Sequence, residues 1–131
     1  MARIGLVTLV VAEYDEAIAF YRDRVGFEVV ADTDLGEGRR WVVVAPPGDA
    51  PQPATGVLLA KASGLQQLAR IGDQTGGRVA LFLMTDDLAA DHARMTAAGV
   101  TFVEEPRAEA YGTVAVFEDL YGTRWDLIQP A

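Results

Sequence analysis

The sequence predicts an α+β fold made of two similar modules, each with one strand, one helix and three further strands. Three observations lead to this prediction. Apolar residues change from strand-like to helical spacing in the same order twice along the chain. Each helix is followed by a glycine, Gly26 or Gly99, where a left-handed cap is favourable. The order recurs after about 74 residues and only twice, which indicates two paired modules rather than a solenoid array.

The first module covers residues 1–62. Helical spacing of Ala17, Ile18 and Tyr21 predicts a helix that ends at Gly26. Turn residues between the second and third strands predict a connection over residues 32–38. Proline lacks the amide donor that a sheet requires, so residues 46–53 are expected to form a loop. The four predicted strands are residues 3–11, 27–30, 40–44 and 56–61.

A linker over residues 63–77, with a short helix at 65–71, leads to the second module at 78–131. Asp86 or Asp87 is expected to cap the second helix, and Leu88 and Met95 lie on one face of it. The predicted strands of this module are residues 78–85, 100–103, 113–117 and 124–128.

Composition excludes several classes of protein. The chain has 131 residues, with 11 basic and 19 acidic residues and a net charge of −8, which argues against a nucleic-acid partner. It contains no cysteine, so disulfides and thiolate metal sites are excluded. Its longest apolar run, residues 5–12, is too short to span a membrane, and we see no signal peptide. We therefore expect a cytoplasmic protein without a membrane partner.

Three stretches carry a resemblance to a known family. They are LVVAEYDEAIAFYRDRVGFEVV, TDDLAADHARMTAAGVTFVEEP and FEDLYGTRWDLIQP. In this order and spacing they resemble the vicinal oxygen chelate superfamily, the group of glyoxalases, bleomycin resistance proteins and extradiol dioxygenases. The resemblance implies that residues 1–131 form a single domain whose modules make a half-open β-barrel with helices on the outside. It also implies a small-molecule ligand in the barrel cavity.

The metal-using members of this family carry a histidine on the first strand of each module and a glutamate on the last. Transferred to this chain, the histidine positions fall on Leu6 and Ala80, which cannot bind a metal. The first glutamate falls on Leu59 or Ala60, because the proline-rich loop leaves the register of this strand open. The second falls on Asp126. We therefore expect no metal and no cofactor.

Asp126 lies in the middle of the last predicted strand, where burying an unpaired carboxylate is costly. Three interpretations remain open: a pair with a neighbouring arginine or tyrosine hydroxyl, contact with a ligand or service as a general base, and metal binding. Acid–base work would require a pKa raised by desolvation. Asp126 is the best candidate for a catalytic residue.

Strand alternation predicts which side chains line the cavity. If Asp126 faces inward, Arg124 does too, whereas Trp125 and Leu127 pack beneath the helices. Trp41 and Tyr111 could stack on a flat ligand or pack half-buried. Leu6 and Ala80 could equally fill a core. The predicted ligand-binding residues are Leu6, Thr8, Trp41, Ala80, Phe82, Met84, Tyr111, Arg124 and Asp126.

Two further features allow more than one interpretation. The charged segment 104–112 could form a lid over the cavity or a solvated loop. His92, the single histidine, is expected on the surface of the second helix, which leaves no partner for a catalytic triad.

Two functional classes remain. The first is a metal-independent small-molecule binding protein similar to the bleomycin-resistance branch, which would hold a hydrophobic or cationic compound. The alternative is a lyase, isomerase or dioxygenase-type enzyme with a degenerate metal site or with Asp126 as its acid–base group, in which Thr8 and Arg124 orient the substrate. In either case we expect a homodimer, because unpaired strand edges are prone to association.

Overall fold

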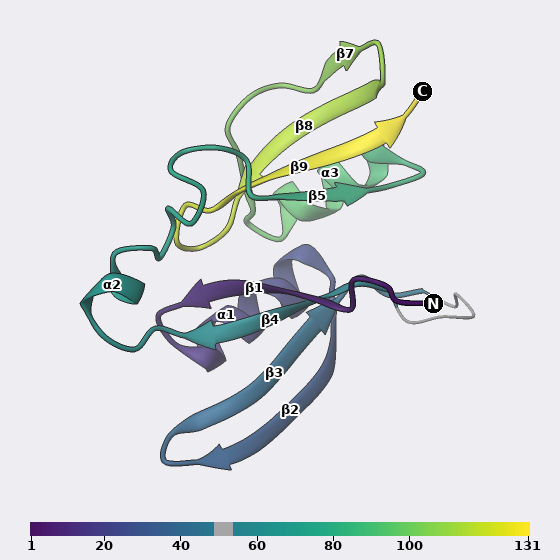
Figure 1. The fold of residues 1–131 in the computed structure, drawn as a ribbon. Coiled ribbons are helices and arrows are strands. Elements are labelled where there is room, and N and C mark those ends of the chain that lie inside the picture. Colours follow the sequence, from purple (N-terminus) through teal and green to yellow (C-terminus); the bar gives the residue numbers. More distant parts are fainter. Residues whose placement is uncertain (49–53) are drawn as a thin grey trace. The chain divides into compact units, whose positions relative to one another are not determined.

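The computed structural model describes residues 1–48 and 54–131, so residues 49–53 of the predicted proline-rich loop lie outside the described residues. The chain divides into two compact units, unit 1 at Met1–Ile71 and unit 2 at Gly72–Ala131. Each unit has its own sheet and helix (Figure 1). Within the described part of the chain, none of the helices is both long enough and apolar enough to cross a membrane.

Unit 1 contains a four-stranded sheet in the order β1-β4-β3-β2. Strands β1 and β4 are parallel, and the other neighbours are antiparallel. Helix α1 packs against β3 and β4. The elements are β1 (Leu6–Val11), α1 (Tyr14–Ala19), the π-helix η1 (Phe20–Val25), β2 (Glu28–Gly36), β3 (Arg39–Ala45), β4 (Gly56–Lys61) and α2 (Leu65–Leu68).

The first helix ends as the sequence predicts. Gly26 adopts a φ of 96°, and its amide and that of Phe27 both donate to the carbonyl of Tyr21 at 3.0 and 2.8 Å. Its last part widens into the π-helix η1, which the apolar spacing does not predict. Tyr21 is fully buried and stacks on Phe27 with ring centroids 5.8 Å apart.

The hairpin of β2 and β3 is longer than the sequence predicts. The predicted connection over residues 32–38 begins too early, because β2 continues to Gly36, but its end agrees with the start of β3 at Arg39. The turn needs only Gly36, Glu37 and Gly38, all at positive φ. Within the hairpin, the Arg40 guanidinium pairs with Asp32 at 2.7 Å, so these charged residues stabilise strand pairing rather than a loop.

Unit 2 contains a sheet in the order β5-β9-β8-β6, with β7 added to β8. The segment 104–112 is therefore not wholly a solvated loop, because three of its residues form strand β7. A Cβ at Gly112, where β8 begins, would lie 2.3 Å from the carbonyl oxygen of Gln129, so only glycine fits there. The elements are β5 (Leu81–Met84), α3 (Leu88–Ala97), β6 (Thr101–Phe102), β7 (Arg107–Glu109), β8 (Gly112–Glu118) and β9 (Arg124–Pro130).

Helix α3 begins at the predicted cap. The Asp87 carboxylate accepts a hydrogen bond from the Ala90 amide at 3.1 Å. The Leu88 amide donates to the Gln129 side chain of β9 at 2.9 Å, which fixes the start of the helix over the sheet. Leu88 and Met95 are buried, as the sequence predicts.

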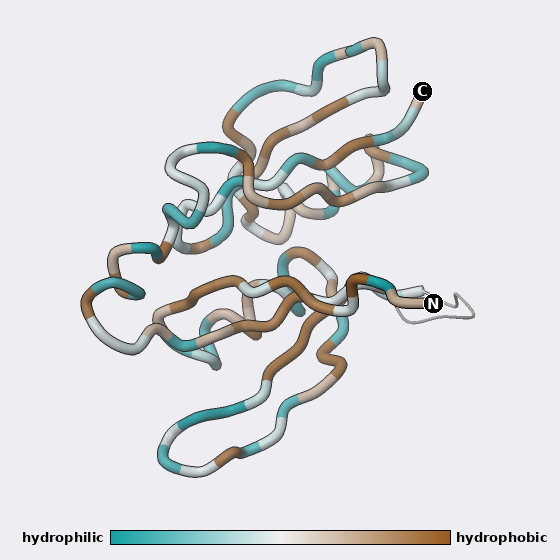
Figure 2. The backbone as a smooth tube through the Cα atoms, in the orientation of Figure 1, coloured by the Kyte–Doolittle hydropathy of each residue, from teal (hydrophilic) through white to brown (hydrophobic). Residues whose placement is uncertain are grey.

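Each sheet has one face beneath its helix and one on the other side, which we call the helix face and the open face. The helix face of unit 1 carries Leu9, Val11, Val42, Val44 and Leu59, and that of unit 2 carries Ala115, Phe117, Trp125 and Leu127; all of these are buried. Hydrophobic residues follow the sheet strands, whereas the tip of the β2–β3 hairpin is mostly hydrophilic (Figure 2). The predicted α+β class, with two modules of one strand, one helix and further strands, is confirmed.

Candidate functional site

Pairing of β1 with β4 decides which residues of unit 1 share the open face. Leu6 lies opposite Gly56, Thr8 opposite Leu58, and Val10 opposite Ala60. Because alternate residues of a strand face the same way, Leu6 and Ala60 belong to the open face. Leu59 is fully buried on the helix face. The sequence leaves open whether Leu59 or Ala60 lies on the open face, and the structure shows that it is Ala60.

A cavity of about 460 Å³ lies on this open face. Leu6, Trp41 and Val43 give it apolar walls, and Arg3 and Glu28 add one charge of each sign. Trp41 is 42% exposed, so its ring is available for contact. An apolar hollow with few polar groups is typical of a small-molecule site.

Glycine is required at one point of this cavity. A Cβ on Gly56 would lie 2.8 Å from the Val43 side chain and 3.1 Å from that of Leu6. Any side chain there would push these two walls apart or fill the hollow between them. Gly56 therefore maintains the shape of the cavity.

A second cavity, of about 670 Å³, also uses Trp41 as a wall. Its lining includes Leu58 and Ala60 of β4 as well as three basic residues, Arg39, Arg40 and Lys61. Sequence reasoning missed these basic residues, although the alternation of β3 could have placed Arg39 on the same face as Trp41.

In unit 2, Asp126 lies at the centre of the open face. It sits opposite Phe82 of β5 and Val116 of β8. The residue is only 7% exposed, and its Oδ1 atom accepts no hydrogen bond from the described residues. Desolvation raises the pKa of the Asp126 carboxyl, while the positive charge of Arg107 opposes this rise.

The positive charge that opposes the rise in the pKa of Asp126 is therefore that of Arg107 in β7. Strand alternation in the sequence instead predicts Arg124 as the neighbouring cation. The Arg124 guanidinium instead lies 3.6 Å from the Glu118 carboxylate. Arg107 also forms ion pairs with Glu104 and Glu109. The missing signal was strand β7 itself, since its pairing with β8 brings Arg107 onto the sheet.

The other predicted site residues lie on several elements of the two units. Phe82 and Met84 are 59% and 57% exposed on the open face of unit 2. Tyr111 is exposed between β7 and β8. Thr8 is exposed in β1. His92 of α3 contacts Phe102, with ring centroids 4.1 Å apart.

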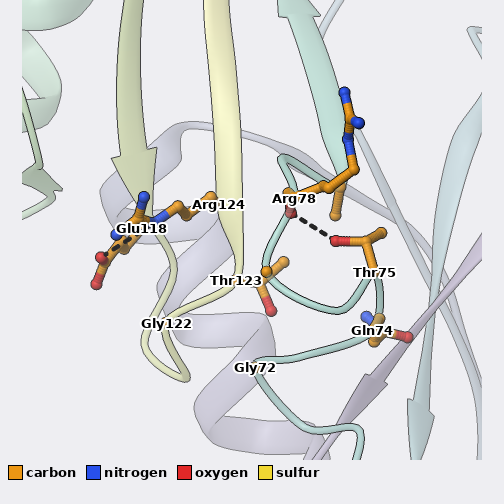
Figure 3. A pocket seen from close by; sticks show the side chains of 10 residues that line it. Gly72, Gln74, Thr75, Arg78, Glu118, Gly122, Thr123 and Arg124 are labelled. Atoms are coloured by element: carbon orange, nitrogen blue, oxygen red, sulfur yellow. Dashed lines mark hydrogen bonds and ion pairs between the residues drawn. The ribbon is translucent and has the colours of Figure 1, made fainter.

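Ala80 and Arg124 line a different cavity, of about 330 Å³, with Thr123 and Gly122 (Figure 3). This cavity has a polar lining that includes Gln74, Thr75 and Glu118. The Ala80 amide donates to the carbonyl of Arg124 at 2.9 Å, which holds β5 beside β9. Within unit 2, Ala80 and Arg124 therefore line a polar cavity rather than an apolar one.

Comparison with known proteins identifies the family. A family model described as the Glyoxalase/Bleomycin resistance protein/Dioxygenase superfamily matches residues 3–127. The chain belongs to this superfamily. It is 52% identical over 124 residues to an uncharacterised protein of Shewanella frigidimarina (strain NCIMB 400), covering 94% of this chain and 90% of that relative.

Two solved structures of the superfamily fold are similar over nearly their whole length. UcmS2 is 34% identical with a TM-score of 0.83, covering 98% of both chains. TnmS3, titled an antibiotic binding protein from Streptomyces sp. CB03234, is 30% identical with a TM-score of 0.76. That comparison covers 100% of this chain and 98% of TnmS3.

The donor atoms of this chain do not fit the superfamily's metal. Leu6, Ala60 and Ala80, which the resemblance aligns with three of its ligand positions, offer no donor side chain. Across residues 1–48 and 54–131, no group of three or more His, Cys, Asp or Glu side chains comes together. At the fourth position, the charge of Arg107 acts on Asp126 and would oppose a second cation. No step of a reaction is therefore assigned to a metal.

Proposed function

We propose that this chain is a metal-independent small-molecule binding protein that holds a flat apolar compound against Trp41. The observation that carries the proposal is the cavity of about 460 Å³ on the open face of unit 1. Trp41 and Leu6 offer exposed apolar surface there, and an aromatic ring stacked on Trp41 would gain about 0.5–1.5 kcal/mol beyond its burial.

The similarity to TnmS3 supports an antibiotic as the class of ligand. That protein is described as an antibiotic binding protein. It shares 30% of its residues with this chain over the whole length of this chain, so the similarity includes the sequence as well as the fold. An aromatic antibiotic has the flat apolar surface that Trp41 and Leu6 would contact. Binding of this kind requires a shaped cavity but no catalytic group.

Tryptophan fluorescence tests the proposal directly. The chain has two tryptophans, and only Trp41 is exposed to a ligand, because Trp125 is buried. The neutral probe N-phenyl-2-naphthylamine should quench Trp41 on binding. In Trp41→Ala, where binding is followed by the fluorescence of the probe itself, the affinity should fall at least tenfold, as loss of an aromatic anchor does at interfaces. Leu68→Ala, which removes an exposed side chain of α2 outside both cavities, should change it less than twofold.

The same measurement should then use a panel of aromatic antibiotics, with native mass spectrometry of each complex. The bound compound should be recovered chemically unchanged. Probe binding that is equal in wild type and Trp41→Ala would overturn the proposed site.

An enzyme relying on Asp126 is the second candidate function. The buried Oδ1 atom and the raised pKa of the Asp126 carboxyl favour it, because a general base needs such an environment. If this second function is correct, there should be a compound that the wild-type protein converts to a product and that Asp126→Asn binds without converting. Conversion at the same rate by both proteins would exclude Asp126 as the acid–base group.

We further propose that the two modules, residues 1–62 and 78–131 with the linker 63–77, act as one domain in a cytoplasmic homodimer. The absence of cysteine from all 131 residues is compatible with a reducing compartment. The exposed apolar side chains of Phe82 and Met84 favour a partner surface in solution.

A further inference from the structure

Two cavities of unit 1 share Trp41 in their linings. The cavity of about 460 Å³ contains Leu6 and Val43, and the cavity of about 670 Å³ contains Leu58 and Ala60. Trp41 lines both. A ligand stacked on its indole ring could therefore extend from the first cavity into the second.

The two cavities differ in charge. The first has one basic and one acidic residue, Arg3 and Glu28. The second has three basic residues, Arg39, Arg40 and Lys61, against the single acidic residue Glu37. This local excess of positive charge stands out in a chain whose net charge is −8.

Two of these basic residues are already paired with carboxylates. The Arg40 guanidinium binds Asp15 at 2.8 Å and Asp32 at 2.7 Å. The Lys61 ammonium lies 3.2 Å from the Glu13 carboxylate. Each is therefore partly neutralised before any ligand arrives.

Arg39 differs from both. Strand alternation places it on the same face as Trp41, two residues away, whereas Arg40 faces the opposite side and lies over the Tyr14 ring at 5.2 Å. In the part of the chain that the structure describes, no carboxylate lies within ion-pair distance of the Arg39 guanidinium. Its forked donors are available to bind an oxyanion.

We infer that the ligand of this site is an elongated molecule with a flat apolar body and an anionic group at one end. The body stacks on Trp41, and the anionic group, a carboxylate or sulfonate, binds Arg39 in the second cavity. Side chains two positions apart on a strand are roughly 6.6 Å apart, which is about the length of a fused two-ring system. The inference rests on the proposed function and adds the charge and length of the ligand class.

A matched pair of fluorescent probes tests it. N-phenyl-2-naphthylamine is neutral, and 6-anilinonaphthalene-2-sulfonate has the same rings with a sulfonate at the far end. Quenching of Trp41 reports binding of each probe to wild-type protein. We expect the sulfonate to bind roughly five times more tightly than the neutral probe, and we expect this preference to shrink as salt screens the charge.

Two variants assign the preference to one residue. Arg39→Gln should weaken sulfonate binding roughly fivefold and leave the neutral probe within twofold. Arg24→Gln removes the same charge from an exposed arginine of η1 that lines neither cavity, and it should leave both affinities within twofold. This control measures the effect of net charge alone.

The outcomes separate the two proposals. If the neutral probe binds through Trp41 but Arg39→Gln leaves sulfonate binding intact, the inference is overturned and the proposed function stands. Equal losses in Arg39→Gln and Arg24→Gln would also overturn it, because net charge would then explain the preference. If neither probe binds in a manner that depends on Trp41, the proposed function fails and the inference fails with it.

Discussion

Asp126 of β9 lies directly opposite Phe82 of β5 in the parallel pair of unit 2. Phe82 is 59% exposed while Asp126 is 7% exposed, so a carboxylate is buried beside an apolar side chain that is not. Such a carboxylate is better tolerated when protonated, which is why burial raises its pKa. This relationship leads to the first prediction.

The stability of wild type relative to Asp126→Asn should depend on pH. Because the folded-state pKa of Asp126 is raised, its contribution to stability is complete below the unfolded-state pKa and is lost as the pH rises through the folded-state pKa. Asparagine does not titrate. The free energy of unfolding of the variant, compared with that of wild type, should therefore increase between acidic and neutral pH. Urea unfolding at a series of pH values measures this difference.

The control for this prediction is Asp86→Asn, which removes the same charge at an exposed position. Its difference from wild type should vary much less with pH. A loss of several kcal/mol in Asp126→Asn at neutral pH would contradict the prediction, since breaking a buried ion pair has that effect. Asp126 would then serve to stabilise the fold.

Purified protein should contain no stoichiometric divalent metal. Leu6, Ala60 and Ala80 supply no ligand atoms at three of the superfamily's four positions, and one carboxylate cannot hold a transition metal tightly. Elemental analysis by mass spectrometry measures the metal content after gentle purification. About one zinc, nickel, manganese or iron ion per chain would show that other residues form a metal site.

The chain should sediment as a homodimer of about twice its mass of 14.1 kDa. Apolar side chains on the open faces, including Phe82 and Met84, are exposed to an extent that favours burial against a second copy. A stable interface of this kind buries roughly 1,600 Å² in total. Sedimentation equilibrium at micromolar concentration gives the mass, and a value near that of a single chain would refute the prediction.

Gly112→Ala should destabilise unit 2 by roughly 2 kcal/mol or more, because backbone atoms cannot move aside as a flexible side chain can. The new Cβ would lie 2.3 Å from the Gln129 carbonyl oxygen, and the φ of 148° at Gly112 is one that side chains rarely adopt. Gly5→Ala is the control, since its Cβ would meet only Arg3 at 3.9 Å. Chemical denaturation should show a change within about 0.5 kcal/mol for that control.

Arg40→Gln should lower the free energy of unfolding, measured by urea denaturation. The variant loses ion pairs to Asp15 and Asp32 and the contact with the Tyr14 ring, which together hold the β2–β3 hairpin against α1. Arg22→Gln breaks one exposed pair with its neighbour Asp23 and should destabilise the chain less than Arg40→Gln does. Equal losses in the two variants would show that the hairpin does not depend on Arg40.

The sequence by itself determined the order of the main strands and helices, although not β7 or the π-helix, the glycine after each of the two main helices, and the faces of the last strand. Asp87, Gly26 and Gly99 act through hydrogen bonds and backbone angles within a few residues, so their effect can be predicted locally. Period-two alternation likewise placed Trp125 beneath the helix and Asp126 on the opposite face.

Only the tertiary structure decided which strands and charges meet. The pairing of β1 with β4 put Ala60 rather than Leu59 on the open face, and this register depends on residues about 50 positions apart. Strand β7 forms because β8 offers it a free edge, and with it Arg107 acquires its influence on Asp126. The cavities around Trp41 combine residues from distant strands, and neither composition nor local spacing carries information about such contacts.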